Sequence, residues 1–242
     1  MRVIELDNVS KTFKLGTVEV PAVRKLSLRI GKGEFAAITG PSGSGKTTIL
    51  NLIGCLDLPS AGTVRLDGVA TSELDEEALD ALRSRRVGFI FQSFNLIPVL
   101  NAEENVMLPL YLHGISRAEM RRRALEMLEL VGLAGFAGSL PDQLSGGQRQ
   151  RVGIARALVI GPSVILADEP TANLDSGNAA AVVELMRTLN RERGVTFVFS
   201  THDVSLIDKV DRVIQIRDGA LQDDFKPGRE TEQGAQYVGT GA

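Results

Sequence analysis

The sequence predicts an α/β fold with a mainly parallel β-sheet, an antiparallel β flap beside it and an inserted helical subdomain. First, apolar runs of strand length alternate with helical patterns over most of the 242 residues, which is typical of strands joined by crossover helices. Second, these runs lack a polar residue at every other position, as expected for strands covered on both faces. Third, two kinds of segment interrupt the alternation, at 1–34 and 62–70 and at about 95–160.

The expected strands follow in chain order. Residues 1–34 and 62–70 contain alternating segments and glycine turns, which indicate the antiparallel flap. Four apolar runs are expected to form the parallel sheet: 35–39, 87–91, 164–167 and 195–199. A closing hairpin is expected from Asp211 across the Asp218-Gly219 turn.

Helices are expected between these strands. One is expected over 46–56, directly after the first sheet strand, and helical patterns fill about 95–160. Within this second segment, apolar residues recur at spacings of three and four and form one stripe: Met120, Ala124, Leu125, Leu128 and Val131. The arginines at 121–123 are expected on the solvated side. The folded domain is expected to span 1–222, followed by a polar, flexible tail at 223–242.

Composition excludes several classes of protein. The chain has 27 Lys and Arg against 30 Asp and Glu, a net charge of −3, which argues against general nucleic-acid binding. A single cysteine, Cys55, allows no intrachain disulfide or cysteine zinc cluster, and it is expected in the core. His113 is expected to be structural. The longest charge-free stretch, 87–102, is shorter than the roughly 20 apolar residues of a membrane span. An acid at Glu5 leaves no room for a signal-peptide apolar region.

A phosphate-binding loop is expected between the first sheet strand and the helix after it. Glycine-rich backbone N–H groups there can surround phosphate oxygens, and the following helix directs its positive end toward them. The lysine supplies a cation for the β- and γ-phosphates, and the threonine hydroxyl can bind Mg²⁺. The residues fit the G-x-x-x-x-G-K-[ST] pattern in full and predict a P-loop NTPase core: Gly40, Pro41, Ser42, Gly43, Ser44, Gly45, Lys46 and Thr47, with Thr48 next.

Further polar side chains follow the other expected strands. Asp168 and Glu169 end the 164–167 strand, and their alternating directions suit Asp168 to Mg²⁺ and Glu169 to an attacking water. Gln92 follows the 87–91 strand and can coordinate metal or orient water, and His202 follows Ser200-Thr201 and can donate to a γ-phosphate oxygen. Because the carboxyl ends of parallel strands share one edge, these groups are expected to meet the phosphate loop there.

One pentapeptide, Leu144-Ser145-Gly146-Gly147-Gln148, precedes a helix expected over 150–160. It resembles the signature of ATP-binding cassette (ABC) proteins, and the resemblance covers about residues 2–222. A serine and two glycines at a helix N-terminus make a second anion site. Two phosphate-binding surfaces but one nucleotide loop then imply a head-to-tail homodimer, in which each subunit closes the ATP of the other.

The resemblance implies roles for the matching positions. Gly40–Thr47 is similar to the family's phosphate loop, Gln92 to its Q-loop glutamine, and Ser145, Gly146, Gly147 and Gln148 to its signature. Asp168 and Glu169 are similar to the metal-side acid and the catalytic glutamate, and His202 to the switch histidine. Asp175, in Asn173-Leu174-Asp175, is similar to the loop that communicates across the dimer. Phe13, expected in a loop before the second flap segment, is implied to stack on adenine, although many relatives have Tyr there.

Local sequence points to a subfamily. Segments 52–57, 88–96 and 167–171 resemble the lipoprotein-releasing and macrolide-exporter type of ATPase subunit. The resemblance implies an Mg²⁺-dependent ATPase that works as a homodimer on an integral-membrane permease. It also implies a cytoplasmic location, peripheral at the inner face of the membrane. The helical segment and the apolar loop at 94–100 are then expected to form the permease groove, although part of that loop is expected in the core.

Rival classes differ in visible features. DNA-repair ABC ATPases carry coiled-coil or zinc-finger insertions, translation types usually hold two cassettes, and a P-loop kinase has no use for the Ser145–Gln148 motif. A soluble ABC ATPase of the iron–sulfur assembly scaffold type stays open as the alternative, since only the local subfamily sequence argues against it. The transported cargo and the direction of transport are not encoded in these motifs.

Overall fold

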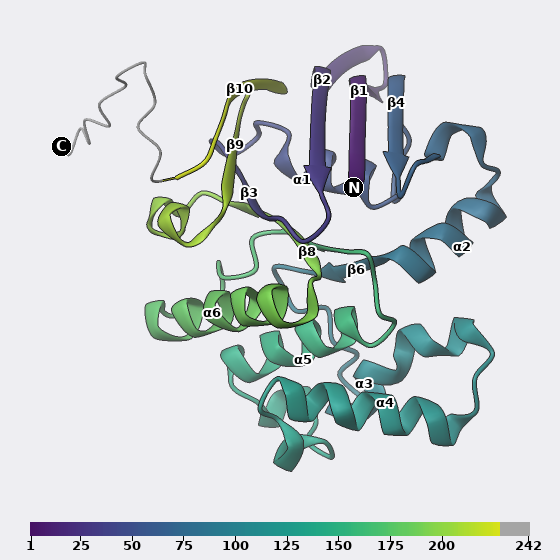
Figure 1. Cartoon of the computed structure of the whole chain (residues 1–242), viewed down its shortest axis with the longest axis vertical. Helices are drawn as coiled ribbons and strands as arrows, with labels where there is room; N and C mark the ends of the chain where they lie inside the picture. The colour runs from purple at the N-terminus through teal and green to yellow at the C-terminus, as the bar shows by residue number, and fades with distance from the viewer. Residues whose placement is uncertain (228–242) are drawn as a thin grey trace.

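The computed structural model describes residues 1–227, in which a mainly parallel six-stranded sheet forms the centre (Figure 1). Its strand order is β10-β9-β3-β8-β7-β6, and only the β9–β10 pair is antiparallel. The strands are β3 Phe35–Thr39, β6 Val87–Ile90, β7 Val164–Ala167, β8 Thr196–Thr201, β9 Arg212–Arg217 and β10 Ala220–Phe225. The expected parallel sheet and closing hairpin are confirmed.

The expected flap is a separate antiparallel sheet of order β2-β1-β4-β5. Its strands are β1 Arg2–Leu15, β2 Val18–Gly31, β4 Ala61–Leu66 and β5 Val69–Ala70. In Figure 1 it lies at the top of the molecule, on the other side of the central sheet from helices α3 to α6.

Six α-helices are present in the described part of the chain: α1 Lys46–Ile53, α2 Glu76–Arg86, α3 Ala102–Met107, α4 Arg117–Leu130, α5 Gly146–Leu158 and α6 Ser176–Arg193. Short 3₁₀ helices connect them: Thr71–Glu73, Leu108–His113, Ala134–Phe136, Pro141–Gln143 and Val204–Lys209. Within residues 95–160 the structure has helices and no strand. None of the helices in residues 1–227 is both long and apolar enough to cross a membrane.

Two apolar cores cover the faces of the central sheet. Along β3, Phe35 and Ala37 face one core with helices α3 to α6, while Ala36 and Ile38 face the other with α1 and the flap. Successive residues of a strand point to opposite faces, so a run apolar at every position fills both cores. This burial holds the carboxyl ends of the strands at one edge.

Helix α4 packs its apolar stripe against the first core. Met120, Ala124, Leu128 and the following Val131 are buried, as the spacing predicts. The prediction is wrong for Leu125, which is 36% exposed. Successive residues are about 100° apart around a helix, so Leu125, which follows the buried Ala124, lies at the edge of the apolar stripe and is partly exposed.

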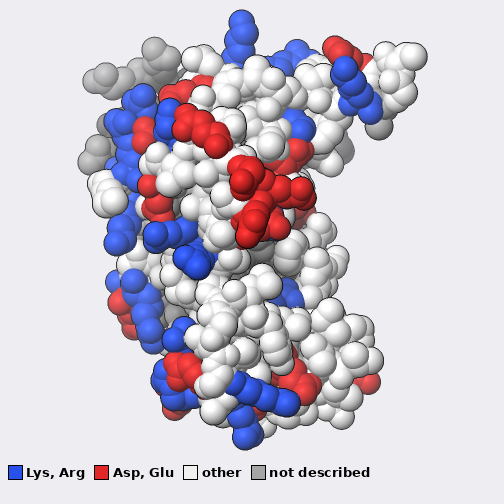
Figure 2. All heavy atoms as spheres, turned by 90° about the vertical axis from the view of Figure 1, so that its right-hand side faces the viewer, with Lys and Arg blue, Asp and Glu red and all other residues white. Residues whose placement is uncertain are grey.

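The arginines at 121–123 lie on the outer side of α4, as expected, and pair with acids. Arg122 and Arg123 contact Glu119, and Arg121 contacts Glu103 on α3. Charges of both signs also cover the face that carries α2, where acidic side chains form a cluster (Figure 2). Helix α2 begins with Glu76 and Glu77, whose charges suit the positive end of the helix dipole.

The expected domain end is wrong by three residues. Strand β10 continues to Phe225, because Asp223, Asp224 and Phe225 pair with β9. Arg212 on β9 also binds the Asp224 carboxylate through two nitrogen atoms, at 2.6 and 2.7 Å. Polar residues at 223 and 224 thus extend an edge strand, and the remainder of the expected tail, 228–242, lies outside the described residues.

Helix α1 ends at Ile53, three residues before the expected end, and Cys55 follows with a left-handed φ of 56°. Cys55 is 1% exposed, as expected for a core residue, and burial raises the pKa of its thiol to about 11. His113 is structural, with its Nε2 atom 3.1 Å from the Ser84 carbonyl oxygen.

Cys55 is expected to resist thiol reagents in the folded protein. With a pKa of about 11, only about 0.1% of the thiol is ionised at pH 8, against roughly a quarter for an ordinary cysteine of pKa 8.5. We therefore expect labelling by a thiol-reactive dye at pH 8 to be at least about 100-fold slower than in denaturant. Since Cys55 is the single cysteine, the rate reports this site alone. Equal rates in both conditions would show that the site is open.

Candidate functional site

The phosphate loop lies between β3 and α1, as the motif predicts. Gly40, Gly43 and Gly45 have φ values of 151°, 77° and 101°, in the left-handed region that favours glycine. A Cβ atom on Gly40 would lie 2.1 Å from the Ile216 carbonyl oxygen, and one on Gly45 would lie 2.4 Å from that of Ala22. The loop is therefore packed between β9 and the flap, and only glycine fits both positions.

Two polar groups of this loop lack the usual partner: the Lys46 ammonium has no carboxylate beside it, and the Ser44 hydroxyl has no hydrogen-bond partner among the described residues. The Lys46 side chain, 6% exposed, donates from Nζ to the Gly40 and Pro41 carbonyl oxygens at 2.9 and 3.0 Å. No carboxylate neutralises it among the described residues. The Ser44 hydroxyl is buried without a hydrogen-bond partner in residues 1–227. A buried cation and an unsatisfied hydroxyl beside a helix N-terminus fit a bound phosphate group.

Asp168 meets this loop through Thr47. The Thr47 hydroxyl donates to both oxygens of the Asp168 carboxylate, at 3.1 and 3.0 Å. Ser200, buried at the end of β8, donates to Asp168 Oδ1 at 2.6 Å. A hydroxyl and a carboxylate thus converge at the carboxyl ends of β3, β7 and β8.

Glu169 lies beyond the end of β7, so strand alternation does not set the direction of its side chain. Its backbone N–H donates to the Ser200 hydroxyl oxygen at 2.9 Å, and its φ of 43° is left-handed. Its Oε1 atom lies 3.3 Å from His202 Nδ1, with the Glu169 side chain 24% and the His202 side chain 66% exposed. Strain of this kind at a non-glycine residue is typical of functional sites. The sequence did not single out Ser200, which holds both acids in their places.

Gln92 follows the carboxyl end of β6, and the contact that holds it there is made by its backbone carbonyl group. Its carbonyl oxygen accepts a hydrogen bond from Asn173 Nδ2 at 3.0 Å, and its side chain is exposed. The loop after it is fixed by Arg156, which donates to the Phe94 carbonyl oxygen at 2.8 Å and to that of Asn95. Phe94 and Asn95 are both left-handed, with φ of 62° and 48°. Sequence reasoning named Asn173 only as part of the Asn173-Leu174-Asp175 segment and missed its contact with Gln92, and it missed Arg156 altogether, because neither follows a strand.

Phe13 lies within β1, so its expected place in a loop is wrong. It pairs with Val20 on β2, and the long flap hairpin continues as strand to Leu15. Its ring is 40% exposed and has Lys11 Nζ 5.1 Å from its centroid. Since Ala22 of β2 touches the phosphate loop, Phe13 lies on the adjoining strand within two pairing positions of that contact. An exposed ring there is available for stacking.

The signature residues begin α5 four positions before the expected start. Ser145 is the N-cap: its side chain accepts from the Gln148 N–H at 3.2 Å, and Gln148 Oε1 accepts from the Ser145 N–H at 2.8 Å. This capping box satisfies two backbone donors and starts the helix at Gly146. A Cβ atom on Gly147 would lie 2.4 Å from Asn178 Oδ1, so a larger residue would require the Asn178 side chain of α6 to move.

Asp175 caps the neighbouring helix α6. Its carboxylate accepts from the Asn178 N–H at 2.9 Å and from Asn178 Nδ2 at 2.6 Å, and these bonds lower the pKa of Asp175. The signature and the 173–178 segment therefore pack together. Among residues 1–227, no hydrogen bond or ion pair joins Ser145–Gln148 to the phosphate loop.

A loop with a buried lysine and two strand-end acids on a parallel sheet defines a P-loop nucleotide-binding protein. A family model described as ABC transporter matches residues 23–172. The chain belongs to the ABC transporter ATP-binding family.

Three relatives show the extent of the similarity. The chain is 46% identical over 224 residues to a macrolide export ATP-binding/permease protein MacB from Syntrophobacter fumaroxidans, covering 92% of this chain and 31% of MacB. It is 44% identical to a lipoprotein-releasing system ATP-binding protein LolD 1 from Rhodopseudomonas palustris, covering 90% and 98%. The solved dimeric structure of the ATP-binding cassette MJ0796 from Methanocaldococcus jannaschii, bound to ADP and Pi, has 47% identity and a TM-score of 0.85, covering 92% and 98%.

Proposed function

We propose that this chain is the ATP-hydrolysing nucleotide-binding subunit of an ABC transporter of the exporter or lipoprotein-release type. The observation that carries the proposal is the meeting of Thr47, Asp168, Ser200, Glu169 and His202 beside the phosphate loop. These groups supply a phosphate cradle, oxygen ligands for a cation, and a carboxylate–imidazole pair within one edge of the sheet.

The proposed roles follow from these contacts. Lys46 moves its ammonium from the loop carbonyls to the β- and γ-phosphate oxygens of ATP. Glu169 orients the attacking water and accepts its proton, and His202 donates to a γ-phosphate oxygen. Gln92 orients the same water or binds the metal through its amide oxygen.

The residues present fit Mg²⁺. Thr47 and Asp168 offer a hydroxyl and a carboxylate within hydrogen-bond distance of each other, and Gln92 follows β6 at the same sheet edge with an exposed side chain. Mg²⁺ prefers oxygen ligands and is commonly held by one or two carboxylates together with substrate phosphates. The described residues contain no cluster of three or more His, Cys, Asp or Glu that could hold a metal alone. When bound, the ion supplies charge neutralisation at the phosphates.

A head-to-tail homodimer is the proposed working form. Ser145 is exposed at the start of α5, where the helix has its positive end, while Gly146 is half-buried and Gly147 is buried behind it. They make no contact with the phosphate loop of their own chain in residues 1–227, so they are available to the ATP of a second copy. The solved MJ0796 cassette is described as dimeric, which supports this arrangement.

The proposed membrane partner is a permease that receives the loop after Gln92. Val99 is 82% and Ile97 is 42% exposed in this loop, while Asn105 fixes its backbone by accepting from the Ile97 N–H and donating to three carbonyl oxygens. A rigid loop that exposes apolar side chains suits a protein partner. The proposed location is the cytoplasmic face of the membrane, bound through this permease.

The test is a membrane co-purification of the tagged chain with a co-expressed permease that has four spans and a large external domain, encoded beside it. Val99→Glu is expected to reduce the permease recovered at least about tenfold, because a charge would be buried in the interface. ATP hydrolysis by the isolated Val99→Glu chain is expected to be unchanged. Leu221→Glu, on exposed β10, is the matched control and is expected to bind normally. Recovery of iron–sulfur assembly proteins in place of the permease would favour the alternative.

A further inference from the structure

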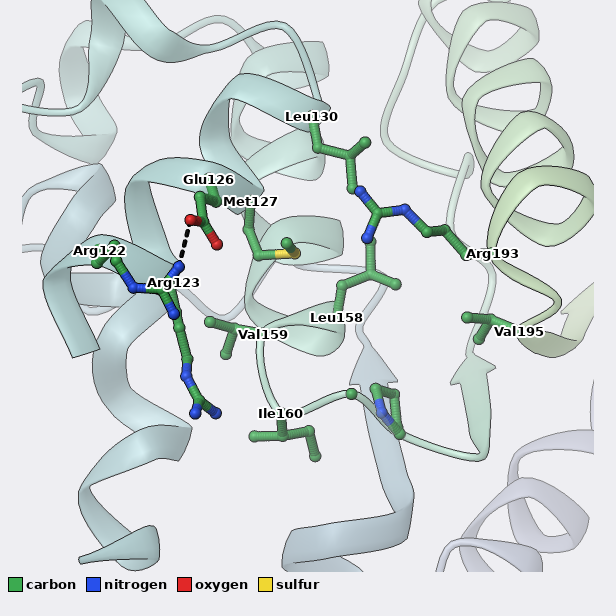
Figure 3. Close-up of a pocket in the computed structure, with 12 residues that line it drawn as sticks. Arg122, Arg123, Glu126, Met127, Leu130, Leu158, Val159, Ile160, Arg193 and Val195 are labelled. Atoms are coloured by element: carbon green, nitrogen blue, oxygen red, sulfur yellow. Dashed lines mark hydrogen bonds and ion pairs between the residues drawn. The ribbon is translucent and has the colours of Figure 1, made fainter. Parts of the chain in front are cut away.

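A cavity of about 460 Å³ lies between α4, the end of α5 and the end of α6 (Figure 3). Its apolar lining comes from all three segments: Met127, Leu130, Leu158, Val159, Ile160 and Val195. Leu158 and Val159 are buried, whereas Met127, Leu130, Ile160 and Val195 are partly exposed and pack against the first core. The lining is amphipathic, because four charged side chains, Arg122, Arg123, Glu126 and Arg193, share it with these apolar residues.

The cavity is separate from the nucleotide site. Pro162 and Val195 line it just before β7 and β8 begin, whereas Asp168 and His202 follow the opposite ends of those strands. The four residues of β7 alone span about 13 Å. The cavity lies where the helical segment meets the central sheet. Helix α4 supplies one wall, and the residues just before β7 and β8 supply the other.

The charged groups of the lining are three arginines and one glutamate. Arg122 pairs with Glu126 and with Glu119, whose Oε1 is 2.7 Å from Arg122 Nη2, and Arg123 pairs with the same Glu119 at 2.7 Å. The charges of these two arginines and two glutamates cancel. Arg193 makes no hydrogen bond or ion pair within residues 1–227, and Figure 3 shows its guanidinium between Leu130 and Leu158. The cavity therefore has an excess of one positive charge beside a mixed lining of polar and apolar groups.

We propose that this cavity binds an amphipathic monocarboxylate, such as a single-chain fatty acid. The carboxylate pairs with Arg193, whose planar guanidinium can donate two parallel hydrogen bonds to it. The acyl chain lies on Met127, Leu158 and Ile160. One negative charge matches the single unpaired cation, and the seven or more apolar carbons of such a ligand match the lining. This site goes beyond the proposed transport function and does not depend on it.

The experiment uses decanoate as the probe, below its micelle-forming concentration, and the full chain labelled with ¹³C at the methionine methyl groups. Met127 lines the cavity, and Met107 is buried in α3 outside the lining. We expect the Met127 methyl resonance to shift with decanoate and saturate, while the Met107 resonance stays in place. Acetate, which has no chain, is expected to cause no shift, and decanol, which has no charge, is expected to bind at least tenfold more weakly.

Arg193→Gln is expected to weaken decanoate binding at least tenfold without loss of fold, because its side chain is exposed. Arg191→Gln is the matched control: it lies in the same last turn of α6 but does not line the cavity. Equal affinity of Arg193→Gln and the parent chain would overturn the proposal, as would a linear, unsaturated shift. A Met127 shift with phosphatidylglycerol vesicles but not with decanoate would assign this surface to a membrane and overturn it too.

Discussion

Glu169→Gln is expected to lower ATP turnover by about 10²–10⁴-fold while ATP binding is retained, because a general base of this kind contributes about that factor. Gln has the shape of Glu and keeps an oxygen that can face His202 at the 3.3 Å separation, but it cannot take a proton from water. The phosphate loop is untouched by the change. Phosphate release gives the turnover, and size-exclusion chromatography with light scattering gives the mass. The variant is expected to accumulate as a dimer with ATP and Mg²⁺, since hydrolysis is the step that opens it.

Glu184→Gln is the matched control for this prediction. It makes the same chemical change at an exposed position of α6, away from the site, and is expected to leave turnover unchanged. Removal of Mg²⁺ with a chelator is expected to stop turnover in the parent chain. A Glu169→Gln chain that turns over within a few-fold of the parent would remove Glu169 from the catalytic role.

The strand-end logic predicted which polar groups meet at one edge of the sheet. Asp168, Glu169 and His202 were expected together because an unbroken apolar run defines a strand, and a parallel sheet aligns the ends of its strands. Ser200 escaped notice because a serine at a strand end has no distinctive pattern, although it bonds to both acids. Its role depends on a distance between β7 and β8, which the local sequence does not contain.

Other features depend on contacts between distant segments. Helix α2 was not singled out, because none of its residues is buried and no strong apolar stripe marks it. The sequence does contain a helix-start signal here: Asp75 followed by Glu76 and Glu77. In the structure Asp75 caps α2 by accepting from the Ala78 N–H at 2.8 Å. Phe13 was assigned to a loop because the length of a flap hairpin is set by pairing across strands.

The start of α5 shows a further limit. Two glycines after Ser145 argue against a helix by propensity, so the sequence placed its start at residue 150. The capping box between Ser145 and Gln148 outweighs that cost, and the contact of Gly147 with the Asn178 side chain favours the small residue. Packing against Asn178 therefore explains Gly147, and the helix begins at Gly146.

Ser145→Asp is expected to weaken the ATP-dependent dimer by about 10³-fold. Aspartate caps a helix as well as serine does, so α5 is expected to keep its start. Its negative charge, however, would face the phosphates of the partner's ATP. Two like charges about 4 Å apart repel by roughly 4 kcal/mol at the effective dielectric constant near a protein surface, which corresponds to about three powers of ten. Ser145→Asn caps equally well without the charge and is the matched control.

Mixing two inactive variants separates a shared site from one built within a single chain. Lys46→Ala disables the phosphate loop, and Ser145→Asp disables the signature. In a mixed dimer, one site combines both defects, while the other combines the intact loop of one chain with the intact signature of its partner. With random pairing in an equal mixture, half of the dimers would be mixed and about a quarter of all sites intact, and because the intact site favours the mixed dimer, turnover is expected to recover to at least about that fraction. A mixture as inactive as either variant alone would contradict the head-to-tail arrangement, because the loop and signature of one ATP site would then belong to the same chain.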